Sequence, residues 1–219
     1  RYSKSLIEHY GVKTPIFAVS NGIDLDQYGA NPEKEAAFRR YFDIKEGEKV
    51  VMGAGLFFLR KGIDDFVKVA QAMPDVRFIW FGETNKWVIP AQVRRLVNGN
   101  HPKNLIFPGY IKGEVYEGAM TGADAFFFPS REETEGIVVL EALASRQHLV
   151  LRDIPVYNGW VDQNSAELAT DLAGFIQALT KVLAGDSNKI DAGYKVAQSR
   201  RLETVGQALV DVYKKVMEL

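Results

Sequence analysis

Four glutamates gather where an apolar segment gives way to a helix. The segment "FFFPS" is followed by "REETEG", which contains Glu132, Glu133 and Glu135, and Glu141 follows among apolar residues. A solvated acidic turn, or the favourable interaction of a carboxylate with a helix N-terminus, explains any one of them. Glu133 and Glu141 stand eight residues apart, and Glu141 would need hydrogen-bond partners if it were buried. Because carboxylates accept hydrogen bonds from vicinal hydroxyls, this pair could clasp two sugar rings around a phosphate at the helix N-terminus.

Two cations precede a glycine that opens another helix. Arg60 and Lys61 stand directly before Gly62, where the positive end of the helix dipole disfavours them. Either Asp64 and Asp65 in the first turn neutralise them, or they hold a phosphate together with the free helix amides. The sequence leaves both explanations open. The familiar nucleotide fingerprints do not fit, because "GAGLFF" lacks the third glycine of a dinucleotide loop and "RKGI" lacks the residue order of a P-loop.

Strands and helices that alternate along the chain must position these loops. Continuous apolar runs predict strands at 15–20, 49–55, 76–82, 104–109, 125–130 and 148–153. Helices are predicted at 1–11, 31–42, 62–73, 89–99, 113–124, from 136 onward, and around 171–185, 187–202 and 203–218. No strand is expected after Pro155. This order predicts an α/β fold, a Rossmann-like parallel sheet sandwiched by helices with a helical C-terminal tail. Such sheets bind ligands at the C-terminal ends of their strands.

Composition excludes several classes of protein. The 219-residue chain is 47% hydrophobic and 25% charged, and its formal net charge of -1 argues against a nucleic-acid partner. It has no cysteine, which excludes thiolate metal sites, and its three histidines are too far apart for a local metal motif. No apolar run is long enough to cross a bilayer. Because the chain does not begin with methionine, we expect it to be a piece of a longer protein.

The stretch "FFFPSREETEGIVVLEALA" resembles the Glu-x7-Glu motif of family 4 retaining glycosyltransferases, whose GT-B architecture sets two Rossmann-like domains around a cleft. "VSNGIDLDQY", "GAGLFFLRKGIDDFVKVAQAMPDVRFIWFG", "NLIFPGYI" and "GADAFFFPS" fit the family in the same order, so the resemblance covers nearly the whole chain. The variant "EETEGIVVLEALA…RDIPVY" looks most like bacterial enzymes that glycosylate diacylglycerol lipids. The resemblance implies half of a GT-B fold, with 15–219 as the nucleotide-sugar-binding domain and 1–14 as the end of a preceding domain or a linker helix.

The resemblance also implies roles for individual residues. Glu133 would contact the donor hexose as the catalytic residue, and Glu141 would hold the ribose. The other implied donor contacts are Lys61 and Arg60 at the diphosphate, Gly136, Ile137 and Val138 at the hexose and diphosphate, and Tyr110 and Ile111 along the base. No metal ion or other cofactor is expected, because the leaving phosphate itself would take the acceptor proton.

The implied reaction is transfer of a hexose, with retention, from UDP-glucose or UDP-galactose to an acceptor such as diacylglycerol or a glycolipid. A missing N-terminal domain would bind the acceptor, so this chain alone is expected to be inactive. The expected location is the cytoplasm, with any contact to the inner face of the cell membrane made through that missing domain. Leu56 stands where the family has an arginine, and Glu135 stands where it has a phenylalanine. These departures favour one alternative, a catalytically silent sugar-nucleotide-binding scaffold. A second alternative is a different enzyme on the same architecture, a GT-B sugar-nucleotide epimerase.

Overall fold

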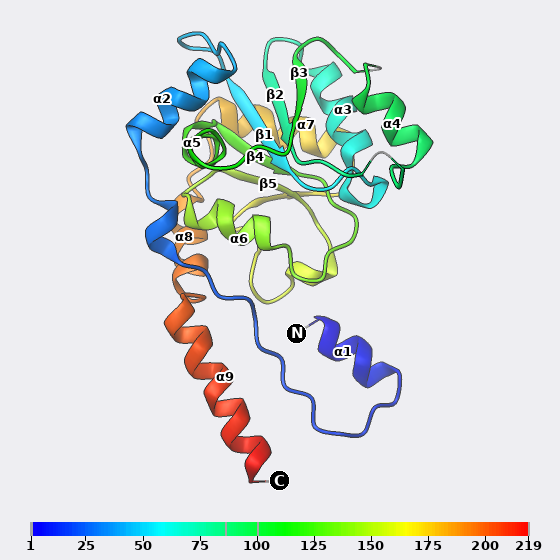
Figure 1. Cartoon of the computed structure of the whole chain (residues 1–219), viewed down its shortest axis with the longest axis vertical. Coiled ribbons are helices and arrows are strands. Elements are labelled where there is room, and N and C mark those ends of the chain that lie inside the picture. The colour runs from blue at the N-terminus through cyan, green and yellow to red at the C-terminus, as the bar shows by residue number, and fades with distance from the viewer. Residues whose placement is uncertain (1, 86, 100, 219) are drawn as a thin grey trace.

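The computed structural model describes residues 2–85, 87–99 and 101–218 (Figure 1). Its strands are β1 (Val50–Ala54), β2 (Arg77–Phe81), β3 (Leu105–Gly109), β4 (Ala125–Phe128), β5 (Leu149–Arg152) and β6 (Glu167–Ala169). Its α-helices are α1 (Tyr2–His9), α2 (Pro32–Tyr41), α3 (Ile63–Ala72), α4 (Ala91–Val97), α5 (Glu114–Gly122), α6 (Ile137–Ala144), α7 (Leu172–Leu183), α8 (Ile190–Gln198) and α9 (Leu202–Met217). Three short 3-10 helices are η1 (Leu25–Tyr28), η2 (Leu59–Lys61) and η3 (Pro155–Tyr157).

The strands described here form one parallel sheet in the order β3-β2-β1-β4-β5-β6. Val51 at the centre of the sheet lies opposite Phe78 of β2 and opposite Ala125 of β4. After β1 the chain adds strands on one side, and from β4 onward it adds them on the other. The boundary between β1 and β4 is therefore a topological switch point, where sheets of this kind bind ligands. The predicted Rossmann-like α/β fold is confirmed.

Helices cover both faces of the sheet, as its apolar strands require. Helices α3, α4 and α7 pack together on one face, while α2 packs on α5 and α6 packs on α8 on the other (Figure 1). The central strands are buried along their whole length, and the ring of Phe66 packs against those of Trp80 and Phe127 in the core. This double covering leaves only the ends of the strands and their loops to carry chemistry.

Two predictions about strands are wrong. Residues 15–20 form no strand, and the segment pairs only further on, through a single bridge between Ile23 and Arg201. Strand propensity is insufficient there, because a strand needs a sheet edge to satisfy its backbone hydrogen bonds. Conversely, a strand does follow Pro155: β6 pairs with β5, with Leu168 opposite Leu151. It has three residues, which is too short to show a period in the sequence.

Predictions from local chemistry are confirmed. The side chain of Asn31 caps α2 by accepting hydrogen bonds from two amides of the first turn, and Pro32 occupies the first helical position. The C-terminal tail is helical, and α9 projects away from the sheet without a buried residue (Figure 1).

The division of the chain into 1–14 and 15–219 stays a prediction.

Candidate functional site

The loops that follow β1 and β4 meet at the carboxyl edge of the switch point. Gly62, at the end of the first loop, adopts a left-handed backbone conformation, and a methyl group built on it would lie 2.2 Å from the carbonyl oxygen of Pro129. The second loop is hydrogen-bonded to the first: the backbone amide of Arg131 donates to the carbonyl oxygen of Arg60 at 2.7 Å. Only glycine allows so close an approach of the two backbones. The loops are thereby fixed as one unit.

This unit brings Lys61 and Glu133 together. The ammonium Nζ of Lys61 lies 2.5 Å from Oε1 of Glu133, and the hydroxyl of Ser130 donates to the same oxygen at 2.7 Å. The two side chains are largely buried, with exposed fractions of 14% for Lys61 and 7% for Glu133. The sequence prediction had placed these residues in one site without pairing them. A buried lysine and carboxylate at a strand-end crevice form a charged centre that a polar ligand can engage.

The aspartates of α3 do not neutralise the loop cations. Asp64 and Asp65 instead bind Arg131, at 2.7 and 2.5 Å, and Asp65 also binds Arg152 at 2.5 Å. Burial acts to raise the pKa of Asp64, but hydrogen bonding and the charge of Arg131 outweigh it and hold that pKa below its usual value. The explanation in which Asp64 and Asp65 neutralise Arg60 and Lys61 is wrong, because the arginines of later loops reach them first. The signal for this network was Arg131, inside "SREETEG", which the sequence reasoning passed over.

Arg60 carries a charge that its neighbours in this loop do not neutralise. No carboxylate in the described part of the chain comes within 4.0 Å of its guanidinium, which lies 5.8 Å over the ring of Phe58. Its side chain is exposed at the carboxyl edge of the sheet. An anion could therefore use Arg60 directly, whereas it would have to compete with Glu133 for Lys61.

The helix after the acidic loop starts without a side-chain cap. Gly136 takes a left-handed conformation as the N-cap of α6, and no side chain bonds to the first amides. The amides of Ile137 and Val138, at the first two helical positions, are thus free of side-chain partners at the positive end of the helix. The Ile137 side chain is 51% exposed, and that of Val138 is half-buried. This arrangement suits an anion such as a phosphate.

Glu141 lies further along α6 in an environment of its own. It is half-buried, and the hydroxyls of Tyr28 and Tyr116 are the polar groups that act on the pKa of its carboxyl group. Burial raises the pKa of Glu141 above its ordinary value, and the two hydroxyls oppose that rise. Burial and the neighbouring Glu141 raise the pKa of Tyr28 to about 12. Both tyrosines were missed by sequence reasoning: Tyr28 ends η1 and Tyr116 lies in the first turn of α5, and neither stands in a motif that indicates a ligand. The prediction that Glu133 and Glu141 face one cleft remains a prediction.

Tyr110 and Ile111 follow β3 at the same edge of the sheet. Tyr110 is 65% exposed, with the ammonium of Lys112 5.0 Å from its ring, and Ile111 is half-buried against the core. Their contacts with a ligand stay a prediction.

Glu135 turns away from this site. Its carboxylate accepts hydrogen bonds from the amide and side chain of Asn21, at 3.0 and 2.6 Å, and pairs with Arg200 at 2.5 Å. The side chain of Glu135, where the family has a phenylalanine, is therefore held by Asn21 and Arg200. Leu56, the other departure, is exposed in the loop after β1.

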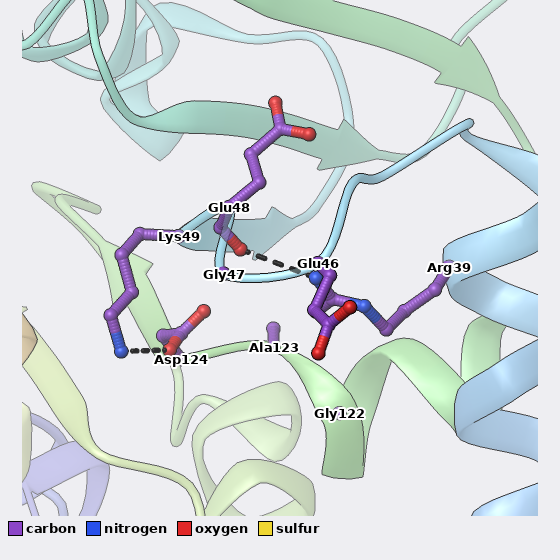
Figure 2. A pocket seen from close by; sticks show the side chains of 8 residues that line it. All are labelled: Arg39, Glu46, Gly47, Glu48, Lys49, Gly122, Ala123 and Asp124. Carbon is purple, nitrogen blue, oxygen red and sulfur yellow. Dashed lines mark hydrogen bonds and ion pairs between the residues drawn. The ribbon is translucent and has the colours of Figure 1, made fainter.

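Two hollows lie apart from the paired Lys61 and Glu133. One, of about 420 Å³, opens at the amino edge of the sheet, where Lys49 and Asp124 face each other at 2.7 Å (Figure 2). It is on the wrong side of a parallel sheet for a ligand site. The other, of about 460 Å³, lies between η1 and α5 and is lined partly by Tyr28 and Tyr116.

The described residues offer neither a metal cluster nor a membrane-spanning helix. No group of three or more histidine, aspartate or glutamate side chains among residues 2–85, 87–99 and 101–218 could hold a metal ion. Within the same residues, no helix is both long enough and apolar enough to span a bilayer. The expectation that no metal is required concerns the reaction and stays a prediction.

Comparison with known proteins places this fold and site in a family. Residues 34–187 match the family model described as "Glycosyl transferases group 1", and the chain belongs to that family. It is 49% identical, over 222 residues, to the processive diacylglycerol alpha-glucosyltransferase of Acholeplasma laidlawii, covering 100% of this chain and 67% of the relative. It is 30% identical, over 149 residues, to the alpha-galactosylglucosyldiacylglycerol synthase of Streptococcus pneumoniae, covering 67% of this chain and 40% of the relative.

Solved structures share the fold. The sucrose-phosphate synthase of Thermosynechococcus elongatus matches with a TM-score of 0.84 at 19% identity, over 99% of this chain and 56% of that chain. Anabaena Alr3699/HepE, solved in complex with UDP-glucose, matches with a TM-score of 0.80 at 17% identity, over 99% of this chain and 61% of that one. The chain therefore corresponds to a little over half of these solved proteins, in agreement with the predicted half of a GT-B fold.

Proposed function

We propose that this chain is the donor-binding domain of a retaining glycosyltransferase that transfers a hexose from a uridine diphosphate sugar to a lipid acceptor. The observation that carries the proposal is the largely buried pair of Lys61 and Glu133 at the switch point of the sheet. The ammonium of such a pair can stabilise a leaving diphosphate, and the carboxylate can accept hydrogen bonds from sugar hydroxyls. Membership of the glycosyl transferases group 1 family supports the same reaction class.

In the proposed complex the diphosphate lies at the start of α6. The uncapped amides of Ile137 and Val138 and the backbone of Gly136 supply hydrogen-bond donors there. Arg60 and Lys61 supply positive charge from the facing loop. Because these groups already carry the charge that the leaving diphosphate needs, we propose that transfer requires no metal ion. Activity that disappears with a chelator and returns with Mg²⁺ would contradict this part of the proposal.

The sugar and nucleoside occupy the two sides of the diphosphate. We propose that the carboxylate of Glu133 accepts hydrogen bonds from hexose hydroxyls and that the carboxylate of Glu141 accepts them from ribose hydroxyls. The base is proposed to lie along Tyr110 and Ile111. During transfer the acceptor oxygen forms its bond to the anomeric carbon as the bond from that carbon to the diphosphate oxygen breaks. The proton of the acceptor hydroxyl passes to the departing phosphate, and both events occur on one face of the sugar.

The acceptor is proposed from the relatives. One relative is named as a diacylglycerol glucosyltransferase and another as a galactosylglucosyldiacylglycerol synthase, and the alignment with the Acholeplasma enzyme covers all of this chain and 67% of that enzyme. We propose diacylglycerol or its glucoside as acceptor, glucose or galactose as the hexose, and a cytoplasmic enzyme that touches the inner face of the membrane. Because this chain spans only part of its relatives, acceptor and membrane contacts are assigned to the remainder of the full-length protein.

The test is donor binding and transfer by the full-length protein. Calorimetry with UDP-glucose and UDP-galactose should give saturable heat with one of them, and transfer to diacylglycerol in vesicles should give the α-linked product by NMR. An absence of saturable heat with either nucleotide at millimolar concentration would exclude the proposal. Unchanged transfer by both Glu133→Ala and Lys61→Ala would instead favour the scaffold alternative. Epimer formed without acceptor would favour an epimerase.

A further inference from the structure

A tyrosine hydroxyl is buried without a partner beneath the acidic loop. Tyr157, in η3, has a side chain that is 1% exposed. Its hydroxyl has no hydrogen-bond partner among the residues that the structure describes. An unsatisfied buried hydroxyl destabilises a fold, and phenylalanine would fill the same space without that cost. A use for this hydroxyl in another state of the protein would explain its presence.

The position of Tyr157 indicates what that use is. A methyl group built on Gly136 would lie 3.4 Å from the Tyr157 hydroxyl, so the phenol lies directly against the backbone turn that opens α6. Burial raises the pKa of Tyr157, and the negative charge of Glu133 raises it further. The hydroxyl therefore stays protonated and able to donate a hydrogen bond, and it lies against Gly136, three residues along the loop from Glu133.

Glu133 needs a new donor when its present cation is drawn elsewhere. In the present structure Oε1 of Glu133 accepts hydrogen bonds from the ammonium of Lys61 and from the hydroxyl of Ser130. A diphosphate at the start of α6 attracts Lys61 away from Glu133, which leaves a largely buried carboxylate with the Ser130 hydroxyl alone. A buried carboxylate in that condition is unfavourable unless another donor approaches.

We propose that Tyr157 is a positioning residue whose buried hydroxyl donates a hydrogen bond to Glu133 when Lys61 no longer pairs with it. In the present structure Lys61 holds Glu133, and the hydroxyl has no partner among the described residues. With Lys61 engaged by an anion, the hydroxyl takes over and holds Glu133 in place. The diphosphate that draws Lys61 away and the consequence for turnover rest on the proposed function, whereas the response of Tyr157 to the loss of Lys61 does not.

The exchange is tested first by thermal unfolding of the full-length protein. Tyr157→Phe in the wild-type background removes an unsatisfied hydroxyl and should raise Tm by about 2–4 °C. In the Lys61→Met background Glu133 has lost its cation, so Tyr157→Phe should lower Tm by a similar amount. Ser145→Ala is the matched control, because Ser145 is 6% exposed and its hydroxyl is also unpartnered among the described residues. It should have the same effect in both backgrounds. A Tyr157→Phe shift of the same sign and size in both backgrounds overturns the proposal.

Turnover is the second readout, and it needs only the single variant. Tyr157→Phe should lower kcat about 10- to 100-fold while raising Tm, which a purely structural residue would not do. Ser145→Ala should leave kcat unchanged. Wild-type turnover by Tyr157→Phe overturns the proposal even if Lys61→Met does not fold. If wild-type protein transfers no sugar at all, the proposed function fails instead, and the comparison of melting temperatures still decides the role of Tyr157.

Discussion

The carboxylate of Glu135 joins Arg200 at 2.5 Å and thereby ties the loop before α6 to the start of the C-terminal tail. The other oxygen of Glu135 binds Asn21, in the extended segment that follows α1. The backbone joins the same two segments, since the amide of Ile23 donates to the carbonyl oxygen of Arg200 at 2.9 Å. One side chain next to the uncapped helix thus fastens both segments that project from the sheet (Figure 1).

Removal of this carboxylate should loosen both segments. We expect Glu135→Ala to lower the free energy of unfolding by about 1–3 kcal/mol, because a charged hydrogen-bonded partner of Arg200 is lost. Urea unfolding of the variant measures the loss, and a double-mutant cycle with Arg200→Met should give a coupling of about 1 kcal/mol. Glu132→Ala is the control, since Glu132 is an exposed carboxylate of the same loop, and should change stability by less than about 0.5 kcal/mol. Equal effects of the two variants would show that the contacts of Glu135 contribute nothing.

The pairing of Lys61 with Glu133 predicts different kinetic effects for its two members. Lys61→Met should raise the Kd for the nucleotide sugar about 10- to 100-fold, because a charge-assisted contact with the diphosphate is lost. Glu133→Gln should lower kcat about 100-fold with a smaller change in Kd, because the carboxylate acts on the hexose as charge develops there. Calorimetry and initial rates on the full-length protein separate the two effects. Lys68→Met removes an exposed lysine of α3 that pairs with Asp64 and Asp65, and it should leave both constants near wild type.

The environment of Glu141 predicts a pH dependence of stability. Burial raises the pKa of Glu141 in the folded protein above its unfolded value, so the folded state binds more protons between those two values. This carboxyl group therefore stabilises the fold fully below the unfolded pKa, and its contribution is lost as pH rises through the folded pKa. Glu141→Gln cannot titrate, so its stability relative to wild type should increase as the pH is raised from about 4 to 7. Urea unfolding across this range measures the difference, and a constant or decreasing difference contradicts it.

The contact between the two loops at Gly62 predicts a strong steric effect. Gly62→Ala combines a φ of 74° with a methyl group 2.2 Å from a carbonyl oxygen, and should destabilise the protein by about 2 kcal/mol or more. Gly206 in α9 is the matched control, because no atom lies within 4 Å of a methyl group built there. Gly206→Ala should stabilise the protein by about 0.5–1 kcal/mol. Thermal unfolding compares the two variants, and similar Tm changes would disprove the steric argument.

The sequence by itself determined the order of the strands from β1 to β5 and of the helices between them, because the relevant interactions are local. Asn31 and Pro32 start α2 through bonds within one turn, and the continuous apolar runs of β1 and β4 require a sheet covered on both faces. The stretch around Glu133, taken together with the other stretches in the same order as in the family, likewise predicted the family. The segment 15–20 was predicted wrongly because its strand character depends on an edge that only the assembled sheet could offer.

Only the tertiary structure decided which charges meet. Lys61 and Glu133 are separated by 72 residues, and their pairing depends on how the loops after β1 and β4 approach each other. The same holds for Arg131 with Asp64 and for Glu135 with Arg200, which are 67 and 65 residues apart. Electrostatic attraction depends on distance through space and on burial, and neither is encoded in the spacing of residues along the chain.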